Sequence, residues 1–191
     1  ATGMHAAAIS TSSAILICAA LTAPKLYSGL SFINPQAMET TYCNPSTKPV
    51  FAKCIRAVYN TPVIGSFMYN LKYNRAAIMD KLSKVSGLEV AQKNELADSM
   101  YEAAHTGGYY GRFLLASIHG NLLNSDIARM LSKLSTPILI VTGSADRQAK
   151  KALPAFDIDK ENISSVILED ISAPQLECPD KLARILNSFF N

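Results

Sequence analysis

The chain has 191 residues, of which 49% are hydrophobic and 17% are charged. Its 18 basic and 15 acidic residues are scattered and give a net charge of +3. The hydrophobic content suffices for a sizeable core. The lack of a basic stripe interleaved with aromatic residues argues against a nucleic-acid partner.

The first 23 residues contain no charged side chain. Their patterning predicts a buried strand over residues 4–9 and then a helix over residues 12–23 that is apolar almost all round, as a helix packed between a sheet and its neighbours would be. A secretory signal segment is the alternative, but no Lys or Arg precedes the apolar run and the hydroxyl residues 10–13 interrupt it. The run is too polar and barely long enough for a membrane span, so we expect no membrane partner.

The patterning changes after the next predicted strand, residues 30–34. Three prolines, Pro45, Pro49 and Pro62, predict a loop-rich stretch. Amphipathic helices are then expected over residues 75–85, 88–105, 109–123 and 126–134.

The last sixty residues carry the clearest pattern. Pro137 introduces a run of apolar, mostly β-branched residues over 138–142, which is typical of a parallel strand buried on both faces. Gly143 ends that strand and places Asp146 at its carboxyl end, where open α/β sheets bind their ligands. A further strand is expected over residues 165–168 and a helix over residues 179–190, so the order of elements predicts βα units and a parallel sheet.

Two segments at a characteristic mutual distance carry a family resemblance, Thr142-Gly143-Ser144-Ala145-Asp146 and Leu176-Glu177-Cys178-Pro179-Asp180. Together they resemble the C-terminal third of the α/β-hydrolase family. Pro24 also lies fourteen residues after Ser10, which is the spacing between nucleophile and proline in that family. The resemblance covers nearly the whole chain from the family's nucleophile-elbow strand onward. It implies an α/β-hydrolase-like half-sheet of parallel strands in residues 1–35 and 135–191, with a helical cap inserted as residues 36–134.

The resemblance also implies roles for four residues. Ser10 would be the nucleophile, the Thr11 amide would contribute to the oxyanion hole, and Asp146 would be the acid of the triad. The family's histidine corresponds to Ser172, and a hydroxyl cannot act as a base toward serine near neutral pH as an imidazole can. A plainer interpretation of Ser10 and its neighbours is that they only cap the following helix.

Three histidines could supply the missing base. His5 comes too early to reach over the carboxyl end of its strand, whereas His105 and His119 lie on the cap, and there they are more often structural. The resemblance makes these two, with Tyr109, candidates for the substrate pocket. Other cap side chains could line the pocket or form the cap's own core: Phe67, Met68, Tyr69, Tyr110 and Phe113.

Two functions follow from the resemblance. One is a serine hydrolase that acts on a small ester or amide, and the other is a catalytically impaired relative that serves in binding or assembly. Because the elbow strand would form an open apolar edge, we expect a second polypeptide or a homodimer to complete the sheet. The four cysteines form no Cys-x-x-Cys pair and have no histidine at ligand spacing, so we expect no metal, no other cofactor, no disulfide framework and a cytoplasmic setting.

Overall fold

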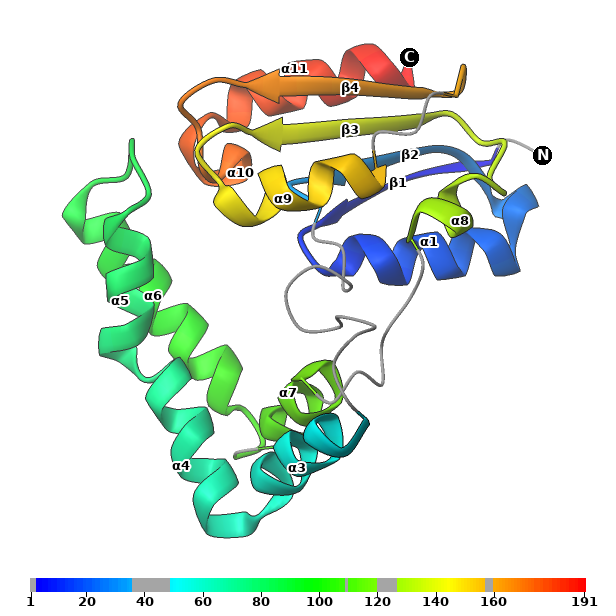
Figure 1. The fold of residues 1–191 in the computed structure, drawn as a ribbon. Coiled ribbons are helices and arrows are strands. Elements are labelled where there is room, and N and C mark those ends of the chain that lie inside the picture. The colour runs from blue at the N-terminus through cyan, green and yellow to red at the C-terminus, as the bar shows by residue number, and fades with distance from the viewer. Residues whose placement is uncertain (1–2, 36–48, 109, 120–126, 157–159) are drawn as a thin grey trace. The chain divides into compact units, whose positions relative to one another are not determined.

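The structure is a computed structural model, and it describes residues 3–35, 49–108, 110–119, 127–156 and 160–191. The chain divides into two compact units (Figure 1), the first made of residues 1–41 and 125–191 and the second of residues 42–124. The boundary near residue 125 differs from the expected one at residue 134. The difference arises because helix α8 (Ile127–Leu131) packs against helices of the first unit, with Ile127 and Leu131 fully buried.

The first unit contains a sheet of four parallel strands in the order β1-β2-β3-β4. The strands are β1 (Met4–Ile9), β2 (Tyr27–Ile33), β3 (Ile138–Gly143) and β4 (Ile163–Leu168). This arrangement confirms the predicted parallel half-sheet, and the most apolar strand, β3, lies in the interior as its patterning requires. Strands β2 and β4 begin earlier than predicted, because Ser28 and Ser164 interrupt the apolar pattern without ending the strands.

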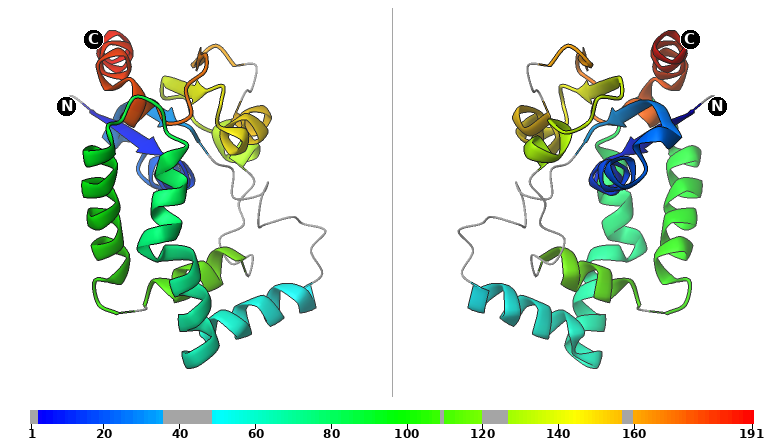
Figure 2. Two further views of the ribbon diagram at one scale, coloured as in Figure 1. Left: turned by 90° about the vertical axis from the view of Figure 1, so that its left-hand side faces the viewer. Right: turned by 90° about the vertical axis from the view of Figure 1, so that its right-hand side faces the viewer.

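Helices cover both faces of this sheet (Figures 1 and 2). Helix α11 (Pro179–Phe190) lies on one face, and α1 (Ser12–Thr22), α8 and α9 (Arg147–Phe156) lie on the other. Two short elements complete the unit, the 3₁₀ helix η1 (Pro24–Leu26) and α10 (Pro174–Glu177). Helix α9 is not among the elements predicted from the sequence. It contains Pro154 near its carboxyl end, and a proline inside a helix usually signals a helix break.

The strand alternation divides the core between the two faces. Ile33, Leu139 and Val141 pack with Leu182 of α11 in one cluster. Their neighbours point to the opposite face, where the ring of Phe32 lies 6.1 Å from that of Phe156 in α9. Because strands β2 and β3 are buried on both faces, their carboxyl ends are held rigidly.

The second unit is helical. It comprises α3 (Pro49–Asn60), α4 (Pro62–Tyr73), α5 (Arg75–Ser83), α6 (Val90–His105) and α7 (Gly111–His119). The expectation of loops around Pro49 and Pro62 is wrong, because each of these prolines begins a helix. At the first helical position proline loses no intrahelical hydrogen bond, and its fixed φ favours the helix. Pro45 and residues 120–126 lie outside the described residues.

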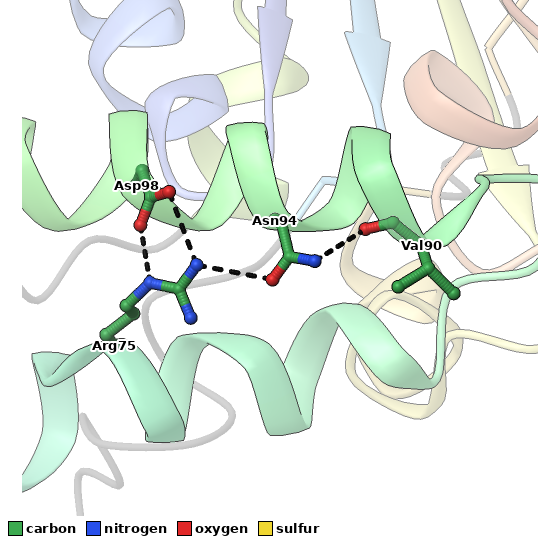
Figure 3. Close-up of polar contacts among 4 residues, drawn as sticks. All are labelled: Arg75, Val90, Asn94 and Asp98. Atoms are coloured by element: carbon green, nitrogen blue, oxygen red, sulfur yellow. Dashed lines mark hydrogen bonds and ion pairs between the residues drawn. The ribbon is translucent and has the colours of Figure 1, made fainter.

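Helices α5 and α6 pack side by side through Ile78, Leu82 and Ala97. An exposed polar chain joins the same two helices (Figure 3). The Arg75 guanidinium donates to both carboxylate oxygens of Asp98, at 2.5 and 3.3 Å, and to Asn94 Oδ1 at 3.2 Å. Asn94 Nδ2 in turn donates to the Val90 carbonyl at 3.0 Å, which lies one turn earlier in α6.

The candidate pocket residues of the second unit fall into two groups. Tyr69 belongs to the core of that unit, because it is 4% exposed and its hydroxyl donates to the Ala104 carbonyl at 2.7 Å. Burial raises the pKa of the Tyr69 phenol. The other four are exposed, so the interpretation of these aromatic and Met side chains as core is wrong for Phe67 (61%), Met68 (38%), Tyr110 (73%) and Phe113 (41%).

None of the helices in the described part of the chain is both long enough and apolar enough to cross a bilayer.

Candidate functional site

Ser10 lies where strand β1 turns into helix α1. Its φ is +59°, a left-handed conformation that is uncommon for a residue with a side chain. Two hydrogen bonds hold the turn, because the Ser10 amide donates to the Ile33 carbonyl at 3.0 Å and the Ser13 amide donates to the Ser10 carbonyl at 3.2 Å. Thr11 immediately precedes the first residue of α1 and already has helical dihedral angles. The chain therefore makes a sharp strand-to-helix turn at a half-buried serine.

Asp146 lies after β3 and immediately before helix α9. Its Oδ1 accepts a hydrogen bond from the Ala149 amide at 3.2 Å, so the carboxylate caps the amino end of this helix. Its Oδ2 accepts a hydrogen bond from Asn34 Nδ2 at 3.2 Å. Both carboxylate oxygens are thus oriented by N–H donors, one from the backbone and one from the loop after β2.

Ser172 lies in the loop after β4, and its side chain is directed to Glu177. Glu177 Oε1 accepts three hydrogen bonds, from the Ser172 hydroxyl at 2.6 Å, the Ser172 amide at 2.9 Å and the Ala173 amide at 2.7 Å. The half-buried carboxylate of Glu177 therefore organises the whole turn. In this arrangement the Ser172 hydroxyl acts as a donor to an anion, and it serves the geometry of its own loop.

The loops that carry Asp146 and Ser172 are packed against each other. The Ser144 amide donates to the Leu168 carbonyl at 2.9 Å, and the Ala145 amide donates to the Ile171 carbonyl at 3.0 Å. A Cβ atom at Gly143 would overlap the Ile171 carbonyl oxygen, so only glycine permits this approach.

Ser10 follows strand β1, Asp146 follows β3 and Ser172 follows β4. All three residues therefore lie at the carboxyl ends of the parallel strands, that is, at the same end of the sheet. Ile9 pairs with Ile33, so Ser10 and Asn34 occupy equivalent positions of neighbouring strands. Carboxyl ends of parallel strands are the usual place for chemistry in open α/β sheets.

The candidate pocket residues belong to the second unit. The His105 ring, at the carboxyl end of α6, lies between two tyrosines, with ring centroids 4.2 Å from Tyr101 and 5.9 Å from Tyr69. His105 Nδ1 is 2.8 Å from the Tyr101 carbonyl, so this histidine is integrated into the packing of its own unit. Tyr109 lies outside the described residues. His119 is the last residue of α7.

Sequence reasoning missed Asn34. This residue is 4% exposed and links the loops after β2, β3 and β4 through its side-chain amide. A signal was present, because Asn followed by Pro directly after a buried strand indicates a special turn conformation. In the predicted strand over residues 30–34, Asn34 is only the last residue.

No family model and no curated protein matches the sequence. Solved structures do match it. One is a 2-hydroxy-6-oxo-6-phenylhexa-2,4-dienoate hydrolase (BphD) from Rhodococcus sp. strain RHA1, with 14% identity, a TM-score of 0.63, and coverage of 98% of this chain and 64% of that one. Another is the meta-cleavage product hydrolase CumD from Pseudomonas fluorescens IP01, with 17% identity, a TM-score of 0.65, and coverage of 99% and 65%.

A thermophilic esterase from Thermogutta terrifontis matches with 13% identity, a TM-score of 0.63, and coverage of 98% and 64%. The chain thus spans a little under two thirds of the length of these three structures, and at such low identity the likeness concerns the fold. The match covers almost the whole chain, and the parallel sheet with helices on both faces agrees with the fold of these structures. The chain therefore has an α/β-hydrolase-like fold.

Proposed function

We propose that this chain is part of a serine hydrolase that acts on a small ester or amide. Ser10 is the nucleophile, Asp146 is the acid that orients a base, and the Thr11 amide donates to the developing oxyanion. Ser172 occupies the position of the family's histidine, so the base is either recruited from elsewhere or absent. The hydrolases named by the similar structures support this class of reaction, and the cysteine pattern supports a cytoplasmic setting.

The single observation that carries the proposal is the backbone of Ser10. A left-handed serine costs about 1–2 kcal/mol relative to ordinary backbone, and such strain persists mostly where function requires it. The turn places a half-buried serine at the end of a strand, directly before the amino end of a helix, whose free amides and dipole favour developing negative charge. A serine that served only as a helix cap would not need this conformation, because N-cap residues normally have β-region dihedral angles.

A fluorophosphonate probe tests this proposal, because only an activated serine is labelled. We expect labelling of the unmodified chain, its loss in Ser10→Ala and its retention in Ser12→Ala, a matched change at the exposed neighbouring serine. No labelling of the folded, unmodified chain would favour the catalytically impaired relative.

We further propose that residues 42–124 act as a cap that supplies an apolar wall for the substrate. The support comes from helix α4, whose exposed side consists of apolar residues at helical spacing: Val63, Ile64, Phe67, Met68 and Leu71. We expect Phe67→Ser to raise KM for an ester with a long acyl chain and to leave KM for an acetyl ester unchanged. Because Phe67 is 61% exposed, its replacement should change the unfolding temperature little, and an equal effect on both esters would refute the cap role.

A second function, assembly with another strand, is favoured by the side of strand β1 that is unpaired in the described part of the chain. Among the described residues β1 pairs only with β2, and its other side borders a groove of about 530 Å³ lined by residues of β1 and α1, including Ile9, Ile15 and Ala19. Ile9 is 40% exposed and Ile15 65% exposed. We propose that a further strand, from a second polypeptide or from a copy of this chain, pairs with this edge. Light scattering coupled to size-exclusion chromatography tests the idea, since a monomer with cooperative unfolding would contradict it.

A further inference from the structure

The side chain of Asn34 forms hydrogen bonds to several residues of the candidate site. Its Nδ2 donates to Asp146 Oδ2 at 3.2 Å and to the Ser172 carbonyl at 2.6 Å. Its Oδ1 accepts from the Gly143 amide at 2.7 Å. An asparagine side chain has two N–H donors and one carbonyl acceptor, so both donors and the acceptor are used within the site.

The two acceptors of Nδ2 belong to different loops. One is the carboxylate proposed as the acid of the triad, and the other is the backbone carbonyl of residue 172, where the family carries its base. Both lie within 3.2 Å of a single nitrogen atom. The amide therefore acts as a spacer between Asp146 and the backbone of residue 172.

The backbone of Asn34 fits this task. Its φ is +43°, a left-handed conformation that asparagine tolerates better than most residues. The Asn34 amide donates to the Val141 carbonyl at 2.8 Å, which ties the residue to β3 directly. At 4% exposure its side chain has little contact with water, so its hydrogen bonds compete weakly with solvent.

We propose that Asn34 is a positioning residue of this site, which holds the Asp146 carboxylate at a fixed spacing from residue 172. The inference rests on the proposed hydrolase function for its chemical meaning. Asn34 does not touch the substrate. It acts through Asp146 and through the loop after β4, so that an N–H donor at position 172 would meet the carboxylate in a defined direction.

The test introduces an imidazole by Ser172→His and asks whether it meets Asp146. An imidazole Nδ1–H that donates to a carboxylate exchanges slowly with water and gives a separate proton NMR signal far downfield. We expect this signal in Ser172→His and its loss in Ser172→His combined with Asp146→Asn. A folded Ser172→His chain without the signal would overturn the proposal, because the carboxylate would then not be aligned with position 172.

The decisive variant combines Ser172→His with Asn34→Gly. Glycine accepts the left-handed backbone and removes only the amide. We expect the imidazole signal to disappear or to broaden into the solvent background. The matched control is Ser172→His with Asp170→Gly, which also places glycine at a left-handed residue, with φ +59°, but removes an exposed side chain. The control should keep the signal, and a signal that survives Asn34→Gly unchanged would refute the positioning role.

A measurement on the unmodified chain covers the case in which Asn34→Gly does not fold. The side-chain NH₂ protons of Asn34 should exchange with solvent much more slowly than those of the exposed Asn187. Equal exchange rates would overturn the proposal.

Hydrolysis provides a separate readout. If Ser172→His hydrolyses p-nitrophenyl acetate, adding Asn34→Gly should lower kcat about 10- to 100-fold, because misplacing a reacting group by about 1 Å costs up to that factor, while KM stays nearly constant. If no variant hydrolyses the ester but the imidazole signal responds as expected, the hydrolase function fails and the positioning role of Asn34 stands.

Discussion

At the scale of single residues, three non-glycine positions in the described part of the chain have a positive φ. They are Ser10, Asn34 and Asp170, which follow strands β1, β2 and β4. Left-handed backbone therefore recurs at the carboxyl edge of the sheet, and two of the three residues belong to the candidate site. Such a concentration of strain is typical of functional sites, where the surrounding structure enforces it.

Replacing Ser10 should separate function from stability. Ser10→Gly removes the steric penalty of the left-handed backbone, whereas Ser10→Ala keeps it. We expect the glycine variant to be more stable than the alanine variant by about 1 kcal/mol in urea unfolding, with neither variant labelled by a fluorophosphonate. Equal stabilities would mean that the turn at Ser10 is not strained.

Glu177 should matter more for stability than Ser172 does. Glu177→Ala removes the acceptor of three hydrogen bonds and leaves two amides without it, at a cost of about 2–3 kcal/mol, because hydrogen bonds to charged groups are among the stronger ones. Ser172→Ala removes only the hydroxyl donor and should cost about 0.5–1.5 kcal/mol. Denaturant unfolding of the two variants measures the difference. A larger loss of unfolding free energy in Ser172→Ala would contradict the conclusion that Glu177 organises the turn.

At the scale of elements, the pair of helices α5 and α6 combines a small apolar core with the exposed contact between Arg75 and Asp98 (Figure 3). The hydrogen bond from Arg75, and then its positive charge, hold the pKa of the Asp98 carboxyl below its ordinary value. A carboxyl with a lowered pKa contributes stability above the pKa of its unfolded state, and this contribution is lost as the pH falls through the folded pKa.

We therefore expect Asp98→Asn to lower the unfolding temperature at pH 7 and to have a smaller effect at a pH below the ordinary range of aspartate. Thermal unfolding over a pH series measures this. Lys84→Ala serves as a control. It removes the exposed ion pair between Lys84 and Asp80, which are close together in the sequence, and it leaves the contact between helices α5 and α6 intact. An effect of Asp98→Asn that does not depend on pH would show that the charge of Asp98 is irrelevant.

At the scale of the whole molecule, the free side of the sheet is the main unexplained feature of the first unit. Helix α1 is apolar almost all round, yet Ile15 is 65% exposed beside the groove along β1. A helix of this composition is normally buried on every side. The proposed partner strand would supply the contact that the described residues do not.

If an added strand covers this groove, Ile15→Lys should weaken self-association or partner binding at least tenfold, since it places a charge in an apolar contact. The measurement is the concentration dependence of the molar mass by light scattering. Leu26→Lys is a suitable control, because Leu26 is 46% exposed and does not line the groove. Equal effects of the two lysines would point to a general loss of solubility.

Most of the sheet was predictable because its strands are local apolar runs. Residues 138–142 contain no polar side chain before Thr142, and only an interior parallel strand tolerates such a run. The end of the sheet that carries the site was predictable for the same reason, because Gly143 and then Asp146 mark the carboxyl end of this strand. Helix α9 and the helices that begin at Pro49 and Pro62 were harder, since a proline signals a helix start or a helix break according to contacts that local sequence does not contain.

By itself, the sequence determined the parallel strands, the interior position of the strand over residues 138–142 and the end of the sheet at which Ser10, Asp146 and Ser172 lie, since these depend on the spacing of apolar runs. Only the tertiary structure decided how these residues are held. The left-handed turn at Ser10 and the orientation of the Ser172 hydroxyl toward Glu177 are seen only in the folded chain. The hydrogen bonds of Asn34 join loops that are up to 138 residues apart in the chain. The physical reason is that hydrogen bonds between loops have no local signature, because the partners meet only after the strands that carry them have packed.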